Sequence, residues 1–245
     1  MNRLQAHLSR RYLDRLFRSP RGRAFVLWQA SAAEGTDEGR FFDVLLERVD
    51  DPQLQKVIER HRDDEIRHAE LFAEAARRTG QPAFAVPADL QLLERLDRAL
   101  GGFFEAFAGD RRTIMDAYLL LQVIEERALT QFRELEPALR RHDVHAADIL
   151  REIARDEERH LKYCAAVAKR YAPDTATREQ TLAHFREVEN RVFAEHSRDV
   201  MSYALDHKLV QVTGPEAMFW RGLVALGARR NHTRPTPYFR TPAVA

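Results

Sequence analysis

The sequence predicts an all-α protein, a four-helix bundle with one long crossover and further helices at both ends of the chain. Three observations lead to this prediction. No stretch of the 245 residues shows the sustained apolar–polar alternation and β-branched enrichment of a strand. Signals for helix starts and stops divide the middle of the chain into two helical hairpins. In addition, the charged quintet Asp-Glu-x-Arg-His occurs in the second helix of each predicted hairpin.

The N-terminal segment is expected to form one helix outside the bundle and then the first helix of the bundle. Leucine and tyrosine side chains recur every four residues over 2–18, which predicts an amphipathic helix. Pro20 and Gly22 interrupt this pattern, and a second helix is expected over 23–49. The interruption is the predicted boundary between an N-terminal helix at 1–22 and the bundle.

The first hairpin is completed by a helix with a clear start signal. Asp51 is expected to be the N-cap, Pro52 to lie in the first turn, and Gly80 to mark the end of the helix. Prolines and glycines then divide the chain into short pieces over 81–110, which predicts the long crossover.

The second hairpin follows this crossover. Its first helix is expected over 111–136, where Pro137 would end it. Asp143 is the expected N-cap of the next helix, which would stop before Pro173. The predicted bundle therefore occupies residues 23–172.

The C-terminal part, residues 173–245, is expected to hold two more helices and a loose tail. Two Thr-x-x-Gln/Glu sequences, which begin at Thr177 and Thr213, have the pattern of capping boxes. They predict helices over 178–209 and 215–229.

Composition limits the class of protein. No apolar run is long enough to cross a bilayer, and the N-terminus lacks the apolar stretch of a secretory signal. The single cysteine, Cys164, excludes an internal disulfide and a cysteine-rich metal knuckle. A cytoplasmic protein without a transmembrane segment is therefore expected.

The net charge is only +1, but the charges are unevenly distributed. Residues 1–23 carry seven Arg and one Asp, and residues 221–245 carry five Arg and no acid, which leaves about −10 on the stretch between them. Such basic ends could bind RNA, an anionic membrane or a partner protein. Solvation, or docking on the acidic middle of the same chain, is the favoured interpretation.

The repeated quintet places a carboxylate and an imidazole on one face of each helix, because residues three apart project together. Both faces also carry apolar residues and should point into the bundle, where unpaired carboxylates would cost several kcal/mol each. A pair of metal cations would supply the missing positive charge. The residues concerned are Glu65, His68, Glu157 and His160.

A two-metal carboxylate site in a helical bundle needs one further Glu from each of the two other helices. In the first hairpin, Glu34 lies 31 residues before Glu65 and has small or apolar neighbours on its helix face. In the second hairpin, Glu125 and Glu126 lie at nearly the same distance before Glu157, so spacing does not choose between them. The apolar stripe around Glu125 favours Glu125.

This set of residues resembles the metal site of the ferritin-like di-iron carboxylate superfamily, which includes rubrerythrins, bacterioferritins, ribonucleotide reductase small subunits and aldehyde-deformylating oxygenases. The resemblance covers about residues 23–171 and implies two iron ions, with an Fe/Mn or Mn pair as alternatives. Glu65 and Glu157 would bridge the metals. The implied ligands are Glu34, Glu65, His68, Glu125, Glu157 and His160.

The other charged residues of the quintets fit a supporting role in such a site. Asp64 and Asp156 would each accept the distal ring N–H of a ligand histidine, namely the one in the other motif. Arg67 and Arg159 either pair with these acids or form ordinary surface salt bridges.

Two further polar residues near the predicted site have open roles. His61 lies one turn before Glu65, where the second motif has Ile153. Its spacing resembles the extra-histidine arrangement of di-iron arylamine N-oxygenases. His61 is therefore either a seventh ligand or, as the favoured interpretation, a hydrogen-bonded interior histidine or a substrate contact. Glu38 is either an accessory carboxylate or a polar lining residue.

The resemblance implies an oxidoreductase that uses O₂ or peroxide, and the favoured reaction is that of an oxygenase or oxidase on a small organic substrate. No catalytic residues are expected beyond the metal ligands. Some large residues either line a substrate pocket or belong to the core: Phe41, Phe72, Tyr118 and Phe132.

Other functions and partners stay open. A ferroxidase or iron-storage protein, a rubrerythrin-like peroxide-detoxifying protein and a tRNA-modifying hydroxylase are the alternatives. Because one cysteine cannot form a four-Cys rubredoxin site, an external electron donor is expected. A homodimer is compatible with this interpretation, and nucleic-acid binding is not favoured.

Overall fold

The computed structural model describes the backbone of residues 3–228, with the side chains of that range apart from those of residues 3–6, 36–38 and 227–228. Within this part of the chain every regular element is helical, as the sequence predicts. Residues 229–245, for which a loose tail is predicted, lie outside the described residues. The elements are α1 (Arg3–Arg18), α2 (Pro20–Ala32), η1 (Ala33–Glu38), α3 (Gly39–Arg48), α4 (Pro52–Arg78), η2 (Ala88–Leu90), α5 (Leu92–Ala99), α6 (Phe103–Ala106), α7 (Arg111–Leu139), α8 (Val144–Tyr171), α9 (Thr175–Asp206) and α10 (Gly214–Ala228).

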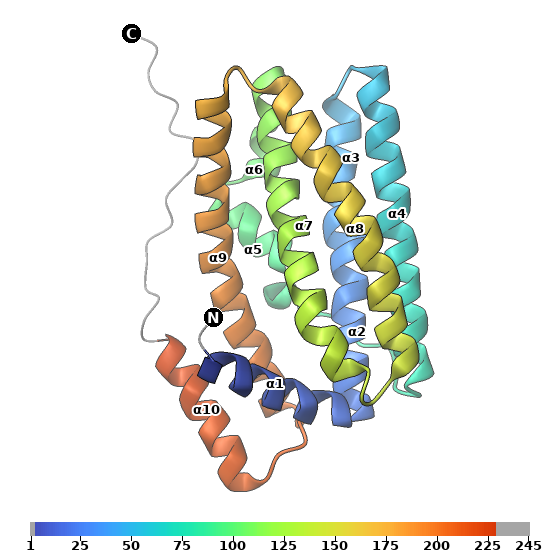
Figure 1. Cartoon of the computed structure of the whole chain (residues 1–245), viewed down its shortest axis with the longest axis vertical. Coiled ribbons are helices and arrows are strands. Elements are labelled where there is room, and N and C mark those ends of the chain that lie inside the picture. The colour runs from blue at the N-terminus through green and yellow to red at the C-terminus, as the bar shows by residue number, and fades with distance from the viewer. Residues whose placement is uncertain (1–2, 229–245) are drawn as a thin grey trace.

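Four long helical segments form the centre of the molecule and run side by side in Figure 1. The first consists of α2, the π-helical η1 and α3, which follow one another and pack against α4 as one hairpin. Helices α7 and α8 form the second hairpin, and α4 also contacts α8. The two hairpins that the sequence predicts are therefore present.

The chain between the hairpins contains only the short helices η2, α5 and α6, in the region predicted as the crossover. Helix α5 packs against both η1 and α9, and α9 lies along α7 outside the two hairpins. The crossover and α9 therefore cover the side of the bundle formed by the first segment and α7.

Aspartate N-caps fix the start of the long helices. Asp51 Oδ1 accepts a hydrogen bond from the Leu54 backbone N–H at 3.2 Å, and Asp143 Oδ1 accepts one from that of Ala146 at 3.0 Å. Such caps stabilise a helix by about 1 kcal/mol. The Tyr171 hydroxyl also donates to Asp51 at 2.9 Å, which ties the end of α8 to the start of α4.

The first bundle helix begins earlier than the sequence predicts. Pro20 and Gly22 do not interrupt the chain; they lie in the first turn of α2, and Ser19 is the N-cap whose hydroxyl accepts from the Gly22 N–H at 3.4 Å. Proline is compatible with the first helical position because its missing N–H would have no helical partner there. The break between α1 and α2 is therefore a single capping residue.

Two other predicted boundaries are wrong. Pro137 lies inside α7, which continues to Leu139, because a proline in the final turn removes one hydrogen bond without affecting a further turn. Helix α9 begins at Thr175, since Asp174 and not Thr177 is the N-cap. The Asp174 carboxylate accepts from the Thr177 N–H at 2.7 Å.

Two clusters of buried apolar side chains fill the bundle. Along α4, Ile58 belongs to the first cluster and Phe72 to the second, with Glu65 between them. Along α8 the order is reversed, with Ile153 of the second cluster before Glu157 and Cys164 of the first cluster after it. Of the residues proposed to line a pocket, Phe41 and Tyr118 lie in the first cluster, Phe72 and Phe132 in the second. Their role towards a substrate stays a prediction.

The basic N-terminal helix packs against the same chain. In Figure 1, α1 and α10 lie at the same end of the molecule. Arg11 pairs with Glu216 of α10 at 2.8 Å, and the Tyr12 ring meets Trp220 edge-on at 5.4 Å between centroids. Among the described helices, none has an apolar stretch long enough for a membrane crossing.

Candidate metal centre

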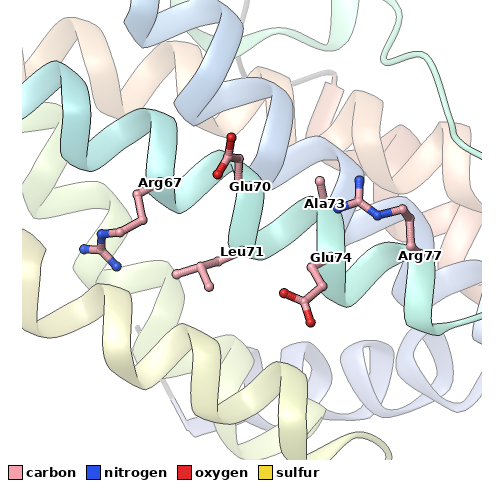
Figure 2. Close-up of a pocket in the computed structure, with 6 residues that line it drawn as sticks. All are labelled: Arg67, Glu70, Leu71, Ala73, Glu74 and Arg77. Atoms are coloured by element: carbon pink, nitrogen blue, oxygen red, sulfur yellow. The ribbon is translucent and has the colours of Figure 1, made fainter.

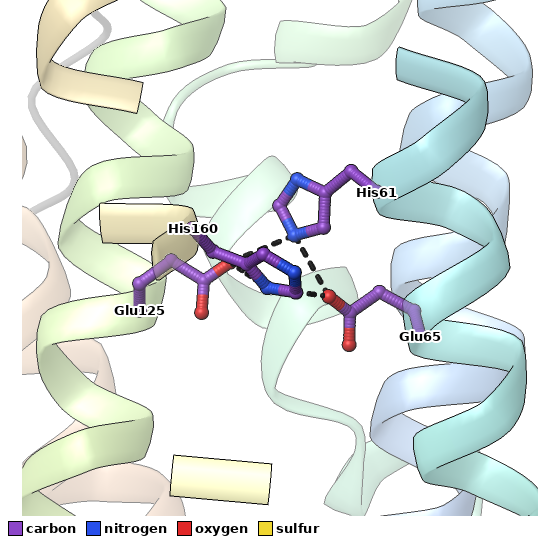
Figure 3. Close-up of side chains that lie close together, drawn as sticks. All are labelled: His61, Glu65, Glu125 and His160. Carbon is purple, nitrogen blue, oxygen red and sulfur yellow. Dashed lines mark ion pairs between the residues drawn. The ribbon is translucent and has the colours of Figure 1, made fainter. Parts of the chain in front are cut away.

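Two groups of buried histidine and glutamate side chains lie in the middle of the bundle. In each group the potential donor atoms all lie within 4.8 Å of one another, and Glu65 belongs to both. Figure 3 shows the first group, with side chains that converge from α4, α7 and α8. The first group is His61, Glu65, Glu125 and His160, and the second is Glu34, Glu65, His68 and Glu157.

The structure thus brings together the six residues predicted as ligands, and adds His61. The exposed fraction is 7% for Glu34 and 2% or less for the other members of both groups. The i, i+3 spacing of each Glu–His pair turns both side chains inward from α4 and α8. Their role as metal ligands stays a prediction.

The two motif glutamates each face both motif histidines. Glu65 Oε1 lies 3.0 Å from His160 Nδ1, and Glu65 Oε2 lies 3.0 Å from His68 Nδ1. Glu157 Oε1 lies 3.1 Å from His68 Nδ1, and Glu157 Oε2 lies 3.1 Å from His160 Nδ1. Two carboxylates therefore span two separate donor positions, one beside each imidazole.

Of the two adjacent glutamates on α7, only Glu125 reaches this cluster. Its Oε1 lies 3.1 Å from His61 Nε2 and 3.8 Å from His160 Nδ1. Glu126 instead accepts two hydrogen bonds from Arg186 of α9, at 2.5 and 2.8 Å. The one-residue offset rotates Glu126 by about 100° around the helix, away from the centre.

Glu34 projects from a π-helical turn that the sequence did not predict. Segment η1 interrupts the first long helix at Ala33–Glu38, and π turns are frequently found at functional sites. At Gly35 a Cβ would lie 3.0 Å from the Ala69 Cβ, so the backbone of η1 closely approaches α4. The glycine after Glu34 is the sequence signal for this approach. The side chain of Glu38 lies outside the described residues.

The distal nitrogens of both motif histidines point outward to aspartates. His160 Nε2 lies 3.2 Å from the Asp64 carboxylate, and His68 Nε2 lies 3.4 Å from that of Asp156. Each aspartate thus contacts the imidazole of the other motif, which fixes both ring orientations and directs both Nδ1 atoms inward.

Two arginines donate hydrogen bonds to these aspartates, and the four residues Asp64, Asp156, Arg67 and Arg159 form an outer layer around the metal centre. Arg159 donates to Asp64 at 2.8 Å and to Asp156 at 2.5 Å, and Arg67 donates to Asp156. Burial alone would raise the pKa of Asp64, but hydrogen bonds from His160 and Arg159 lower it below its ordinary value. The outer carboxylates therefore stay ionised and able to accept from the rings.

The central carboxylates and imidazoles shift one another's pKa in opposite directions. Burial would lower the pKa of His68 and His160, but hydrogen bonds to Glu157 and Glu65 raise it to about 9 and about 10. For Glu157, burial alone would raise the pKa, but hydrogen bonds lower it to about 2. Without a metal, both motif imidazoles are therefore protonated at neutral pH.

His61 differs from these two histidines. Burial lowers its pKa below the ordinary value, so the ring is neutral at neutral pH. Its Nε2 lies 2.7 Å from Glu65 Oε1, yet neither ring nitrogen makes an aligned hydrogen bond. The roles predicted for His61, as a seventh ligand, a hydrogen-bonded interior histidine or a substrate contact, stay predictions. Tyr163, which the sequence did not single out, packs edge-on to His61 at 5.2 Å and lies on the His160 face of α8.

A surface hollow of about 400 Å³ lies along α4, and Figure 2 shows the side chains that line it. All of them come from one helix and most are charged, whereas small-molecule sites are usually concave and mostly apolar. Arg67 alone is shared with the outer layer of the metal centre. The lining residues are Arg67, Glu70, Leu71, Ala73, Glu74 and Arg77.

The chain was also compared with known proteins. No protein-family model, curated protein or solved structure matches it. The buried His/Glu groups are therefore the basis on which a function can be assigned.

Proposed function

We propose that this chain is a ferritin-like di-metal carboxylate oxidoreductase, which uses O₂ or peroxide to oxidise a small organic substrate. The observation that carries the proposal is the pair of buried His/Glu groups that share Glu65. The two hairpins and the long crossover support the ferritin-like topology, because bundles of that type hold two metals with a Glu from each of two helices and a Glu-x-x-His from each of the others.

The residues present fit a pair of iron or manganese ions. The donors are carboxylate oxygens and imidazole nitrogens, which suit these metals, and the only cysteine, Cys164, is buried in the first apolar cluster. Burying several acids in one place is unfavourable without positive charge, which two cations would provide. Under this proposal Glu65 and Glu157 would each hold both metals, and Glu34 and Glu125 would each hold one.

The protein would contribute position, tautomer and exclusion of water. When bound, the metal pair supplies the redox chemistry towards O₂. Asp64 and Asp156 hold the imidazoles with Nδ1 inward, and the two apolar clusters shield the centre along the bundle axis. Since the described part of the chain offers no cysteine pair as a relay, the electrons would come from an external donor.

Metal content and O₂ consumption test the proposal. The protein is purified after growth with iron and with manganese, the metals per chain are counted, and the dithionite-reduced protein is assayed for O₂ uptake. We expect two metals per chain, and both Glu65→Ala and Glu157→Ala should lose metal and O₂ uptake. Full metal content in either variant would show that the bridging assignment is wrong.

Particle size separates this function from iron storage. A monomer or dimer with two metals per chain supports the oxidoreductase. A many-subunit shell that accumulates iron well beyond two per chain would instead identify a ferroxidase or storage protein, with the same donors in a different role.

A further inference from the structure

His61 is placed among the donor atoms by contacts from three helices. Its ring lies 3.9 Å from that of His160 and 4.5 Å from that of Phe42, measured between centroids, and its exposed fraction is 1%. Nε2 lies 2.7 Å from Glu65 Oε1 and 3.1 Å from Glu125 Oε1 (Figure 3). The ring is therefore held with Nε2 directed at two carboxylate oxygens.

These contacts have the form of shared ligation and not of hydrogen bonding. A nitrogen that donates to a carboxylate should be aligned with it, whereas both nitrogens of His61 are buried without an aligned partner. Burying such a group without compensation costs free energy. A cation between Nε2 and the two oxygens would satisfy this nitrogen.

The other motif has no counterpart to this residue. Ile153 precedes Glu157 by four residues, as His61 precedes Glu65, and it is fully buried among apolar side chains. The approximate repeat of the two motifs is therefore broken at one position, and an imidazole is added on one side only.

We propose that His61 is an additional protein ligand for one of the two metals, so that the two metal positions are unequal. This inference rests on the proposed di-metal function. We name each position after its motif histidine. The donors of the His160 position are His160, His61, Glu125, Glu65 Oε1 and Glu157 Oε2, and those of the His68 position are His68, Glu34, Glu65 Oε2 and Glu157 Oε1.

Because their donor sets differ, the two positions should differ in their affinity for metal ions and in the room they leave for a small molecule. Imidazole nitrogen increases affinity for the later divalent metals, so Co²⁺ or Fe²⁺ should fill the His160 position first. The His68 position has fewer protein donors, and it therefore keeps more room for a small exogenous ligand. The substrate or O₂ would then meet the protein at the side of Glu34 and His68.

Titration of the metal-free protein with Co²⁺ tests this inequality, with the visible absorption of Co²⁺ as the readout. Wild type should bind two ions in two resolved steps. His61→Ile, which copies Ile153 of the other motif, should weaken the first step at least ~10-fold, as expected for a lost donor, and merge the two steps. Ile153→Val is the matched control, since it changes a buried side chain of α8 but removes no donor, and it should keep both steps.

A second measurement on wild type does not depend on a folded variant. In the NMR spectrum of the Co²⁺-loaded protein, each ligand histidine gives one strongly shifted, exchangeable ring N–H signal. Three signals are expected, from Nε2–H of His68 and His160 and from Nδ1–H of His61. Two signals would overturn the assignment of His61.

The outcomes separate this inference from the function on which it rests. If wild type binds two Co²⁺ ions and His61→Ile leaves the titration unchanged, His61 is not a ligand and the di-metal proposal stands. If wild type binds no Co²⁺, Fe²⁺ or Mn²⁺ at all, both are wrong.

Discussion

Metal loading should release protons, and the protonation states of His68 and His160 determine how many. In the metal-free protein, hydrogen bonds to Glu157 and Glu65 raise the pKa of His68 to about 9 and that of His160 to about 10, so both rings are protonated at pH 7. Because both direct Nδ1 at Glu65 and Glu157, a metal can bind there only when that nitrogen loses its proton. We therefore expect about two protons released per chain at saturating metal.

Calorimetry in buffers of different ionisation enthalpy measures this number directly. His68→Gln should reduce it by about one, and this difference does not depend on protons lost by metal-bound water. His61→Ile should leave it unchanged, because burial keeps His61 neutral. Two metals bound with almost no proton release would refute the charge state assigned to both imidazoles.

Three further predictions concern stability and affinity. The folded pKa values of His68 and His160 exceed the ordinary value of about 6.5, so the stability that these residues contribute is fully present below pH 6.5 and is lost as pH rises through 9 to 10. The calorimetric Tm of the chelated protein should therefore fall over that range. A Tm that does not change with pH would contradict this. Asp64→Asn should weaken metal binding by about 10- to 100-fold in a competition assay, because the charged carboxylate that accepts from His160 becomes a neutral amide. Unchanged affinity would count against that role. Arg127→Met should lower the free energy of unfolding, measured by urea denaturation, by about 3–5 kcal/mol, because it leaves the buried Glu189 carboxylate without its partner at 2.7 Å. A loss below about 1 kcal/mol would show that the fold does not need this ion pair.

The inward-facing donors could be predicted because two independent periodicities agree. The i, i+3 pairing of Glu with His and the apolar stripes of α4 and α8 select the same helix face. The same logic separated Glu125 from Glu126, where spacing alone did not. Helix faces are a local property, and the sequence encodes them directly.

For other features the sequence allows two alternatives, and only the folded structure shows which of them forms. Asp174 and Thr177 both have capping side chains, and only the folded backbone shows that the first accepts from the second. Pro137 carries a stop signal whose effect depends on how many turns follow it. His61 could be either a packed or a ligating residue, because its neighbour Glu125 lies on another helix and the distance between them is a tertiary property.

The π turn at Ala33–Glu38 has a consequence for how this chain tolerates length changes. A π turn holds about one residue more than an α-helical turn, so removing one residue from this turn would restore a regular helix in which α2 and α3 keep their orientation relative to each other. Leu27 and Phe41, both buried, would then keep their places in the core. A single deletion would thus act mainly on Glu34, which projects from the turn itself, although every donor remained in the sequence. A deletion in this one turn should therefore damage the metal centre more than the fold.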